Sequence, residues 1–164
     1  MLSIRSVTDA DHDAIWEMFQ AVISAEDVFA FDRDMSRDEA LAFWCGADKH
    51  TYVAEENGQV IGSYFIKQNQ QGGGAHVANA GYMVASSARG HHVGRTMCEH
   101  SLKEARRLGF RAMQFNFVVS TNESAIRLWQ QLGFKTVGTL PEAFRHPQRG
   151  YVDVHVMFRS LIED

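Results

Sequence analysis

The spacing of apolar residues along the chain predicts four helices. Between residues 11 and 24, Ile15, Phe19 and Val22 recur at helical intervals, so this segment forms an amphipathic helix. Gly109 and Gly133 each stand between a leucine and a phenylalanine, where glycine can take the left-handed conformation that ends a helix. The remaining predicted helices begin at Ser36 or span Val93 to Leu108 and Ser120 to Leu132.

Alternating and continuous apolar runs predict the strands. Asn57-Gly58 is a strong signal for a two-residue hairpin turn. The glutamine- and glycine-rich stretch from Gln68 to Gly74 indicates a loop tip. The predicted strands span Ile4 to Val7, Thr51 to Glu55, Val60 to Lys67, His76 to Val84, Arg111 to Val119, Phe134 to Val137 and Tyr151 to Phe158.

The order of these elements favours one α/β domain over residues 1–164. It runs strand, two helices, three strands, helix, strand, helix and closing strands, which is typical of a mixed sheet flanked by helices. The middle strand–helix–strand unit is expected to be a parallel crossover. No linker, repeat or charge block divides the chain.

Composition and charge exclude several classes of protein. A formal net charge of −4 does not favour a nucleic-acid binder, which needs a basic face. Cys45 and Cys98 have no paired spacing, so neither a disulfide framework nor a metal site is expected. The polar N-terminus and the lack of a run of about 20 apolar residues predict a cytoplasmic protein that does not bind membranes.

The stretch from Met83 to Thr96 carries the clearest chemical signal. A predicted strand leads through a loop with glycines and arginines into the start of a helix. Backbone N–H groups at a helix start carry partial positive charge and can bind a phosphate, and Arg89 and Arg95 can add charge-assisted bonds. The alternative is a strand–helix turn whose basic side chains are solvated.

Two stretches resemble the GNAT superfamily of N-acetyltransferases. Arg89 to Gly94 resembles the pyrophosphate loop [RQ]-x-x-G-x-[GA], although His92 stands where the pattern has its first glycine. Asn122 to Phe134 is similar to the pattern N-x-x-A-x-x-[LF]-[YF]-x-x-x-G-F. The resemblance implies a mostly antiparallel central sheet with a splayed parallel strand pair. It also implies acetyl-CoA as the co-substrate, with no metal.

The same resemblance implies the residues that bind acetyl-CoA. A backbone N–H near Met83 or Val84 is expected to bind the oxyanion that develops during acetyl transfer. Trp129 stands where many members place a tyrosine acid; it is expected either to pack on the cofactor arm or to belong to the core. The implied contacts are Tyr82, Met83, Val84, Arg89, Gly90, His91, His92, Val93, Gly94, Arg95, Thr96, Asn122 and Trp129.

Asparagines in the predicted sheet are candidate catalytic residues. Asn79 and Asn116 stand in apolar strands expected to be buried, where an amide needs a hydrogen-bonding partner. The arrangement resembles a GNAT subgroup that includes fungal acetyltransferases of proline-like amino acids. That resemblance implies that the two amides hold substrate, whereas a structural role would be to tie loops to the sheet. Asn122 lies within a Ser120–Glu123 capping-box pattern as well as in the family motif.

The proton acceptor and the amine acceptor remain open at this level. Glu55, Glu56 and His76 are candidate bases, and an ordered water is the alternative. Glu26 or Asp27 could pair with an amine, and Arg145 with a carboxylate. The expected reaction is direct acetyl transfer to a small-molecule amine. Protein acetylation and a CoA-binding module without turnover are alternatives, and exposed edge strands allow a homodimer.

Overall fold

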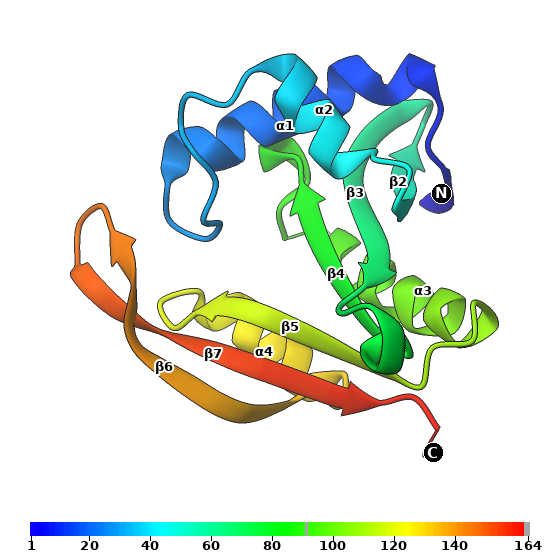
Figure 1. Cartoon of the computed structure of the whole chain (residues 1–164). Helices are drawn as coiled ribbons and strands as arrows, with labels where there is room; N and C mark the ends of the chain where they lie inside the picture. The colour runs from blue at the N-terminus through cyan, green and yellow to red at the C-terminus, as the bar shows by residue number, and fades with distance from the viewer. Residues whose placement is uncertain (91, 163–164) are drawn as a thin grey trace.

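The computed structural model describes residues 1–90 and 92–162, which form a seven-stranded sheet with two helices on each face (Figure 1). The sheet order is β1-β2-β3-β4-β5-β7-β6, and every neighbouring pair is antiparallel except β4–β5. The strands are β1 (Ser3–Ser6), β2 (Lys49–Glu56), β3 (Gln59–Gln68), β4 (Val77–Val84), β5 (Ala112–Val119), β6 (Lys135–His146) and β7 (Gly150–Ser160).

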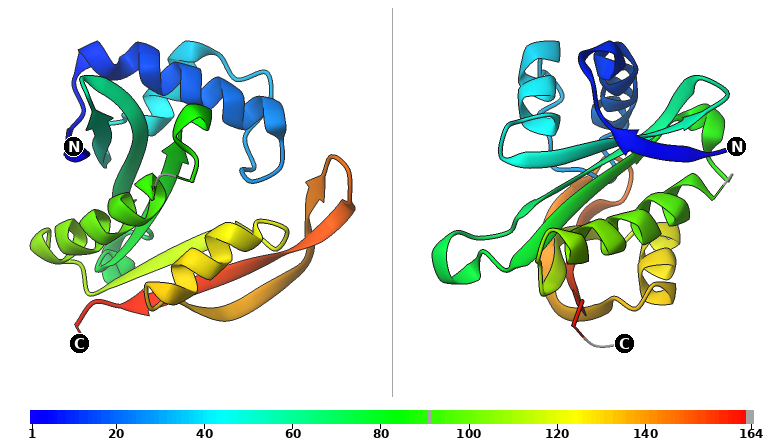
Figure 2. Two further views of the ribbon diagram at one scale, coloured as in Figure 1. Left: turned by 180° about the vertical axis from the view of Figure 1, so that it is seen from behind. Right: turned by 90° about the vertical axis from the view of Figure 1, so that its right-hand side faces the viewer.

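The helices pack on opposite faces of the sheet and divide the core into two layers (Figure 2). On one face, α1 (His12–Ala25) and α2 (Arg37–Trp44) pack against Val53, Phe65 and Met83. On the other face, α3 (Val93–Arg107) and α4 (Glu123–Gln131) pack against the alternate residues, which include Tyr64 and Met113. Successive side chains of a strand point to opposite faces, so each strand serves both layers.

Most predicted elements are confirmed within a few residues. Asn57 and Gly58 both have positive φ, 53° and 76°, as a two-residue hairpin turn of type I′ requires. Gly109 and Gly133 both have a φ of 91° and end their helices. In each case the following phenylalanine donates its backbone N–H to the carbonyl five residues earlier, at 3.0 and 2.9 Å.

Two predictions about local structure are wrong. The last hairpin is much longer than expected, because β6 continues to His146 through an irregular stretch between Leu140 and Phe144. Pro141 fits there because β6 is an edge strand, and an edge strand tolerates a residue without an N–H. The Ser120–Glu123 capping box does not form, because α4 begins at Glu123 with Asn122 as its N-cap.

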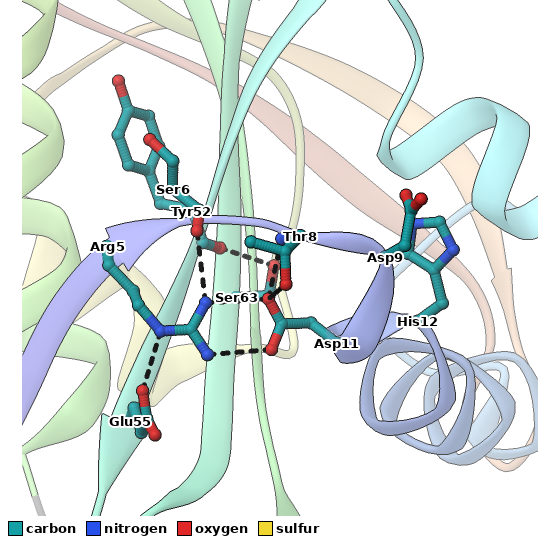
Figure 3. Close-up of polar contacts among 9 residues, drawn as sticks. All are labelled: Arg5, Ser6, Thr8, Asp9, Asp11, His12, Tyr52, Glu55 and Ser63. Carbon is teal, nitrogen blue, oxygen red and sulfur yellow. Dashed lines mark hydrogen bonds and ion pairs between the residues drawn. The ribbon is translucent and has the colours of Figure 1, made fainter.

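A partly buried ion pair fixes the start of the chain to the sheet (Figure 3). The Arg5 guanidinium donates to both carboxylate oxygens of Asp11, at 2.8 and 2.9 Å, and to Glu55 at 2.7 Å. Asp11 is only 4% exposed and also accepts from the backbone N–H of Thr8 at 2.8 Å. The Arg5 hydrogen bonds outweigh burial and lower the pKa of Asp11 below its ordinary value.

Candidate active site

Strands β4 and β5 separate soon after they meet. Only Val77–Ala112 and Ala78–Met113 are paired between them, whereas β4 pairs with β3 along its whole length. Beyond the last pair, the Asn79 side-chain amide donates to the backbone carbonyl of Gln114 at 2.9 Å. A gap therefore opens in the middle of the sheet towards the carboxyl ends of both strands.

The backbone groups of β4 that face this gap can be assigned from its other hydrogen bonds. Val77 accepts from β3 and Ala85 donates to β3, so the odd-numbered residues direct their N–H and C=O groups away from the gap. The backbone of Met83 therefore faces β3, and that of Val84 faces the gap. Of the two predicted oxyanion donors, only the Val84 N–H is placed to act there.

A cavity of about 780 Å³ passes through the gap and connects the two faces of the sheet. Its walls on one face come from the end of α1 and the loop after it, and on the other face from the β4–α3 loop, α3 and α4. Its described lining comprises Val22, Asp27, Val28, Phe29, Ala80, Gly81, Tyr82, Met83, Val84, Ala88, Arg89, Gly90, His92, Val93, Gly94, Arg95, Phe115, Phe117, Val118, Asn122, Ser124, Ala125, Arg127, Leu128, Trp129 and Gln131.

The start of α3 forms the polar wall of this cavity. Val93, Gly94 and Arg95 lie in the first turn, where no preceding helical carbonyl can accept their N–H groups. His92 is the N-cap and has a φ of 59°, in the left-handed region that glycine adopts most easily. The histidine thus adopts a backbone conformation that favours glycine, the residue that the pattern has at this position.

Three arginines give this end of the cavity a positive charge. Arg89 lies in the loop, Arg95 in the first turn of α3, and Arg127 on α4. Arg95 donates to Gln131 and lies 3.7 Å from the carboxylate of Glu99, so its guanidinium is held between the two helices. Converging guanidinium groups and helix N–H groups suit a pyrophosphate or another anion with several oxygens.

Aromatic rings form the apolar wall where the cavity crosses the sheet. The ring of Trp129 lies 5.0 Å from that of Tyr82 and 4.9 Å from that of Phe115, measured between centroids. Trp129 is 9% exposed and belongs to the core cluster, as one of the two predictions has it, and it also lines the cavity. The Tyr82 hydroxyl points into the core and shares a hydrogen bond with Ser101 at 2.6 Å. Burial raises the pKa of Tyr82 well above its usual value.

The model of the acetyltransferase (GNAT) family matches residues 13–134, three quarters of the chain and all of the elements that line the cavity. This chain belongs to the GNAT family. A curated relative, the N-acetyltransferase aca1 of Schizosaccharomyces pombe, is 37% identical over 98 residues, which are 59% of this chain and 47% of that protein. The L-amino acid N-acyltransferase MnaT of Escherichia coli is 27% identical over 86% of this chain and 84% of its own.

Solved GNAT structures have the same fold. A GCN5-related N-acetyltransferase from Kribbella flavida is 46% identical and superposes with a TM-score of 0.93 over 97% of both chains. The acetyltransferase yncA of Salmonella typhimurium, determined with its cofactor acetyl-CoA, is 26% identical, with a TM-score of 0.87 over all of this chain and 96% of that one. The predicted mixed sheet with a splayed parallel pair is therefore confirmed, and the chain is a GNAT acyltransferase domain.

The GNAT motifs place nearly all of their predicted contact residues on the cavity. Eleven of the predicted residues line it, from Tyr82 in β4 to Trp129 in α4. Thr96 does not line it; its hydroxyl donates to the carbonyl of His92 at 3.0 Å. His91 lies outside the described residues. The eleven are Tyr82, Met83, Val84, Arg89, Gly90, His92, Val93, Gly94, Arg95, Asn122 and Trp129.

The two candidate catalytic asparagines lie beside the gap and are not among the lining residues. Asn116 belongs to a row of side-chain amides: Gln114 donates to Asn116 at 2.9 Å, and Asn116 donates to Asn69 at 2.6 Å. The expectation that Asn116 is buried is wrong. It is exposed because the β5–β7 register shifts between Phe115 and Val118, which turns this part of β5 towards solvent.

None of the three candidate bases lines the cavity. Glu55 is bound to Arg5 in the β1–β2 pair, Glu56 ends β2, and His76 precedes β4. Among the described residues, no group of three or more His, Cys, Asp or Glu side chains is arranged to hold a metal ion. Sequence reasoning missed Arg127, Leu128 and other residues of α4, although their helical spacing around Trp129 was a usable signal.

Of the three predicted acceptor-binding residues, one lines the cavity and two do not. Asp27 lines the cavity on the α1–α2 face, together with Val28 and Phe29. Glu26 does not, because it is the left-handed C-cap of α1 and pairs with Arg33 at 3.0 Å. Arg145, on the outer half of β6, is also absent from the lining.

Proposed function

We propose that this domain transfers the acetyl group of acetyl-CoA to the amine of a small molecule, by direct attack within a ternary complex. The observation that carries the proposal is the cavity through the sheet, which has an entrance on each face. A cofactor and an acceptor can therefore bind at the same time and meet at the gap between β4 and β5. No covalent enzyme intermediate is needed for such a reaction.

The residues at the α3–α4 entrance fit acetyl-CoA. First-turn N–H groups of α3, the left-handed His92 and the guanidinium of Arg89 form a cradle for the pyrophosphate. The unpaired edge of β4 beyond Ala78 offers N–H and C=O groups to the amide-containing arm. Bound acetyl-CoA supplies an activated acetyl group: the amine nitrogen bonds to the carbonyl carbon, and the carbon–sulfur bond breaks.

During the transfer, negative charge develops on the carbonyl oxygen next to Val84 and on the departing thiolate next to Trp129. The N–H of Val84 faces the gap and donates to the oxyanion that develops on the carbonyl oxygen. The indole N–H of Trp129 can donate a hydrogen bond to the departing thiolate but cannot protonate it. Tyr82 does not supply that proton, because its hydroxyl is engaged with Ser101 and its pKa is raised by burial. The thiolate therefore takes its proton from water.

The amine loses its proton to water, and side-chain amides position it. Asn79 lies on the α1–α2 face at the point where β4 and β5 separate, and its Nδ2 is already bound to Gln114. That bond holds β4 and β5 together at the point where the gap begins, and so positions the strands between which the amine attacks. Asn116 supports this arrangement through its bonds to Gln114 and Asn69.

One observation favours a second candidate, a CoA-binding module without turnover: Trp129 occupies the place of the tyrosine acid. Release of the free CoA thiol in the presence of a panel of amino acids, amines and peptides separates the candidates. Acetyl transfer predicts thiol release that depends on an amine. A module without turnover predicts a CoA-dependent rise in melting temperature and no thiol release with any amine, and preferential turnover of peptides would indicate protein acetylation.

We also propose that the protein forms a homodimer and lies in the cytoplasm. β6 is an edge strand of twelve residues, largely exposed, and it suits pairing with a second copy of the chain. Both cysteines are free, as is usual in the reducing cytoplasm, where acetyl-CoA is also available. No helix among the described residues is long and apolar enough to cross a membrane. Sedimentation of the purified protein tests the proposed homodimer.

A further inference from the structure

The cavity carries opposite charges at its two entrances. Its cationic side chains, Arg89, Arg95 and Arg127, all lie at the α3–α4 entrance. At the α1–α2 entrance the charged lining residue is Asp27, which is partly buried in the loop after α1. A partly desolvated carboxylate attracts a cation more strongly than a solvated one does. This entrance is therefore suited to a positively charged partner.

Apolar side chains surround Asp27 and define the rest of the acceptor end. Val22 and Val28 line the cavity next to it. Phe29 lines the cavity too and is held in place by stacking on Phe31, with ring centroids 5.2 Å apart. Across the gap, Phe117 contributes a ring that is 37% exposed. These surfaces can bury a hydrocarbon or aromatic body next to the carboxylate.

The acceptor end has no cation to bind a carboxylate among its described lining residues. Arg33, in the same loop, pairs with Glu26 and does not line the cavity. Arg145 does not line it either. A carboxylate that entered here would be desolvated beside Asp27 with no compensating charge, and burying an unpaired charge is costly.

We infer that the acceptor is an amine with an apolar or aromatic body and no carboxylate, and that Asp27 binds its ammonium group on entry. This inference rests on the proposed acetyl transfer and names the substrate class of the same site. The carboxylate of Asp27 accepts hydrogen bonds from the ammonium, while Phe29 and Phe117 contact the carbon skeleton. The ammonium then releases a proton to water and attacks as described above.

Two acceptors that differ by one group test the inference directly. 2-Phenylethylamine and L-phenylalanine share an aromatic body and an amine, but only the second has a carboxylate. Free-thiol release with saturating acetyl-CoA is expected to give a kcat/KM at least about tenfold higher for 2-phenylethylamine. Both ammonium groups can bond to Asp27, but only L-phenylalanine must also bury an unpaired carboxylate beside it. This comparison uses the unaltered protein and does not depend on the folding of a variant.

A matched pair of loop variants tests the role of Asp27. Asp27→Asn is expected to raise the KM for 2-phenylethylamine about tenfold or more, with a smaller effect on kcat and unchanged acetyl-CoA affinity. Asp34→Asn removes a carboxylate from the same loop at an exposed position outside the cavity and is expected to leave the kinetics unchanged. Melting temperatures establish that both variants are folded.

The outcomes separate this inference from the proposed function. Equal or faster acetylation of L-phenylalanine would overturn the assigned substrate class while leaving acetyl transfer intact. Equal KM values for Asp27→Asn and Asp34→Asn would remove Asp27 from the acceptor site. Binding of acetyl-CoA with no turnover of any amine would instead overturn the proposed function, and the inference with it.

Discussion

The carbonyl of His92 accepts two hydrogen bonds from Thr96, one from the backbone N–H and one from the hydroxyl, both at 3.0 Å. These bonds start α3 at a residue whose φ is 59°. The histidine therefore takes on the conformation that a glycine would take at lower cost, and the first-turn N–H groups of α3 stay directed at the cavity. The proposed phosphate site therefore does not require a glycine at this position.

Replacing His92 by glycine is expected to stabilise the loop. A non-glycine residue in the left-handed region costs about 1 kcal/mol, and His92→Gly removes that cost. The greater chain entropy of glycine in the unfolded state offsets part of the gain. We expect a free energy of unfolding that is equal or slightly higher, and an acetyl-CoA dissociation constant that is unchanged or lower. Calorimetry and denaturant titration measure both, and a clear loss of affinity would mean that the imidazole itself binds the cofactor.

Removing Arg89 is expected to weaken acetyl-CoA binding. Arg89→Ala deletes one charge-assisted contact to the pyrophosphate, so the dissociation constant should rise about tenfold. Arg149→Ala is the control, because Arg149 is exposed in the turn between β6 and β7 and does not line the cavity. If calorimetry gave the same affinity for both variants, the guanidinium of Arg89 would have no part in the cradle.

Truncation of the amides beside the gap is expected to impair turnover more than cofactor binding. Asn79→Ala removes the side chain that bridges β4 and β5, and Asn116→Ala removes its support. We expect a fall in kcat of about tenfold or more for Asn79→Ala, because a misplaced amine attacks less often. Steady-state kinetics and calorimetry are the two measurements. Normal kinetics for both variants would show that the amides only tie the strands together.

The chemical role of Trp129 is tested by two substitutions. Trp129→Phe keeps a ring between Tyr82 and Phe115 and is expected to retain substantial turnover, because the indole is not an acid. Trp129→Tyr restores the hydroxyl found in many members of the family. Complete loss of turnover in Trp129→Phe, with normal folding and acetyl-CoA binding, would show that the indole N–H is required.

Asp11 is expected to make stability depend on acid pH. Its folded pKa is lowered, so its contribution is complete above the unfolded pKa of about 3.8 and is lost as the pH falls through the folded pKa. Asp11→Asn is expected to lower the free energy of unfolding by about 1–3 kcal/mol at neutral pH, because the Arg5 guanidinium loses one of its two charged partners. The variant should also lose less stability than the unaltered protein below pH 4.

Denaturant titrations across this pH range check the prediction. Asp9→Asn is the control, because it removes a nearby carboxylate whose side chain is fully exposed. The only ion pair of Asp9 among the described residues is with His12, at 3.8 Å. A pH dependence of stability that is identical in Asp11→Asn and the unaltered protein would show that the Arg5–Asp11 pair does not contribute.

The fold could be predicted from the sequence wherever side-chain periodicity and turn chemistry agreed. Asn57-Gly58 and Gly133 marked real turns, because few residues adopt positive φ without strain. The course of β6 could not be predicted, since Pro141 resembles a strand breaker and only its place on an edge strand makes it acceptable. The exposure of Asn116 depends on a register shift between β5 and β7, a long-range property that local pattern does not carry.

The part of the site that is formed by residues close in sequence could also be predicted. The motifs located the helix start and the gap, because those residues are close in sequence. Asp27 could not be distinguished from Glu26, since only the left-handed turn after α1 decides which carboxylate reaches the cavity. Choosing Val84 over Met83 as the oxyanion donor likewise required the hydrogen bonds between β4 and β3.

Calorimetric titration with acetyl-CoA, in the presence and absence of ADP, measures whether this cavity binds the cofactor. We expect binding with a dissociation constant in the micromolar range, weakened by ADP, because ADP carries the pyrophosphate that we propose binds at the start of α3. Absence of binding, or binding that ADP does not affect, would contradict the assignment of this cavity to the cofactor.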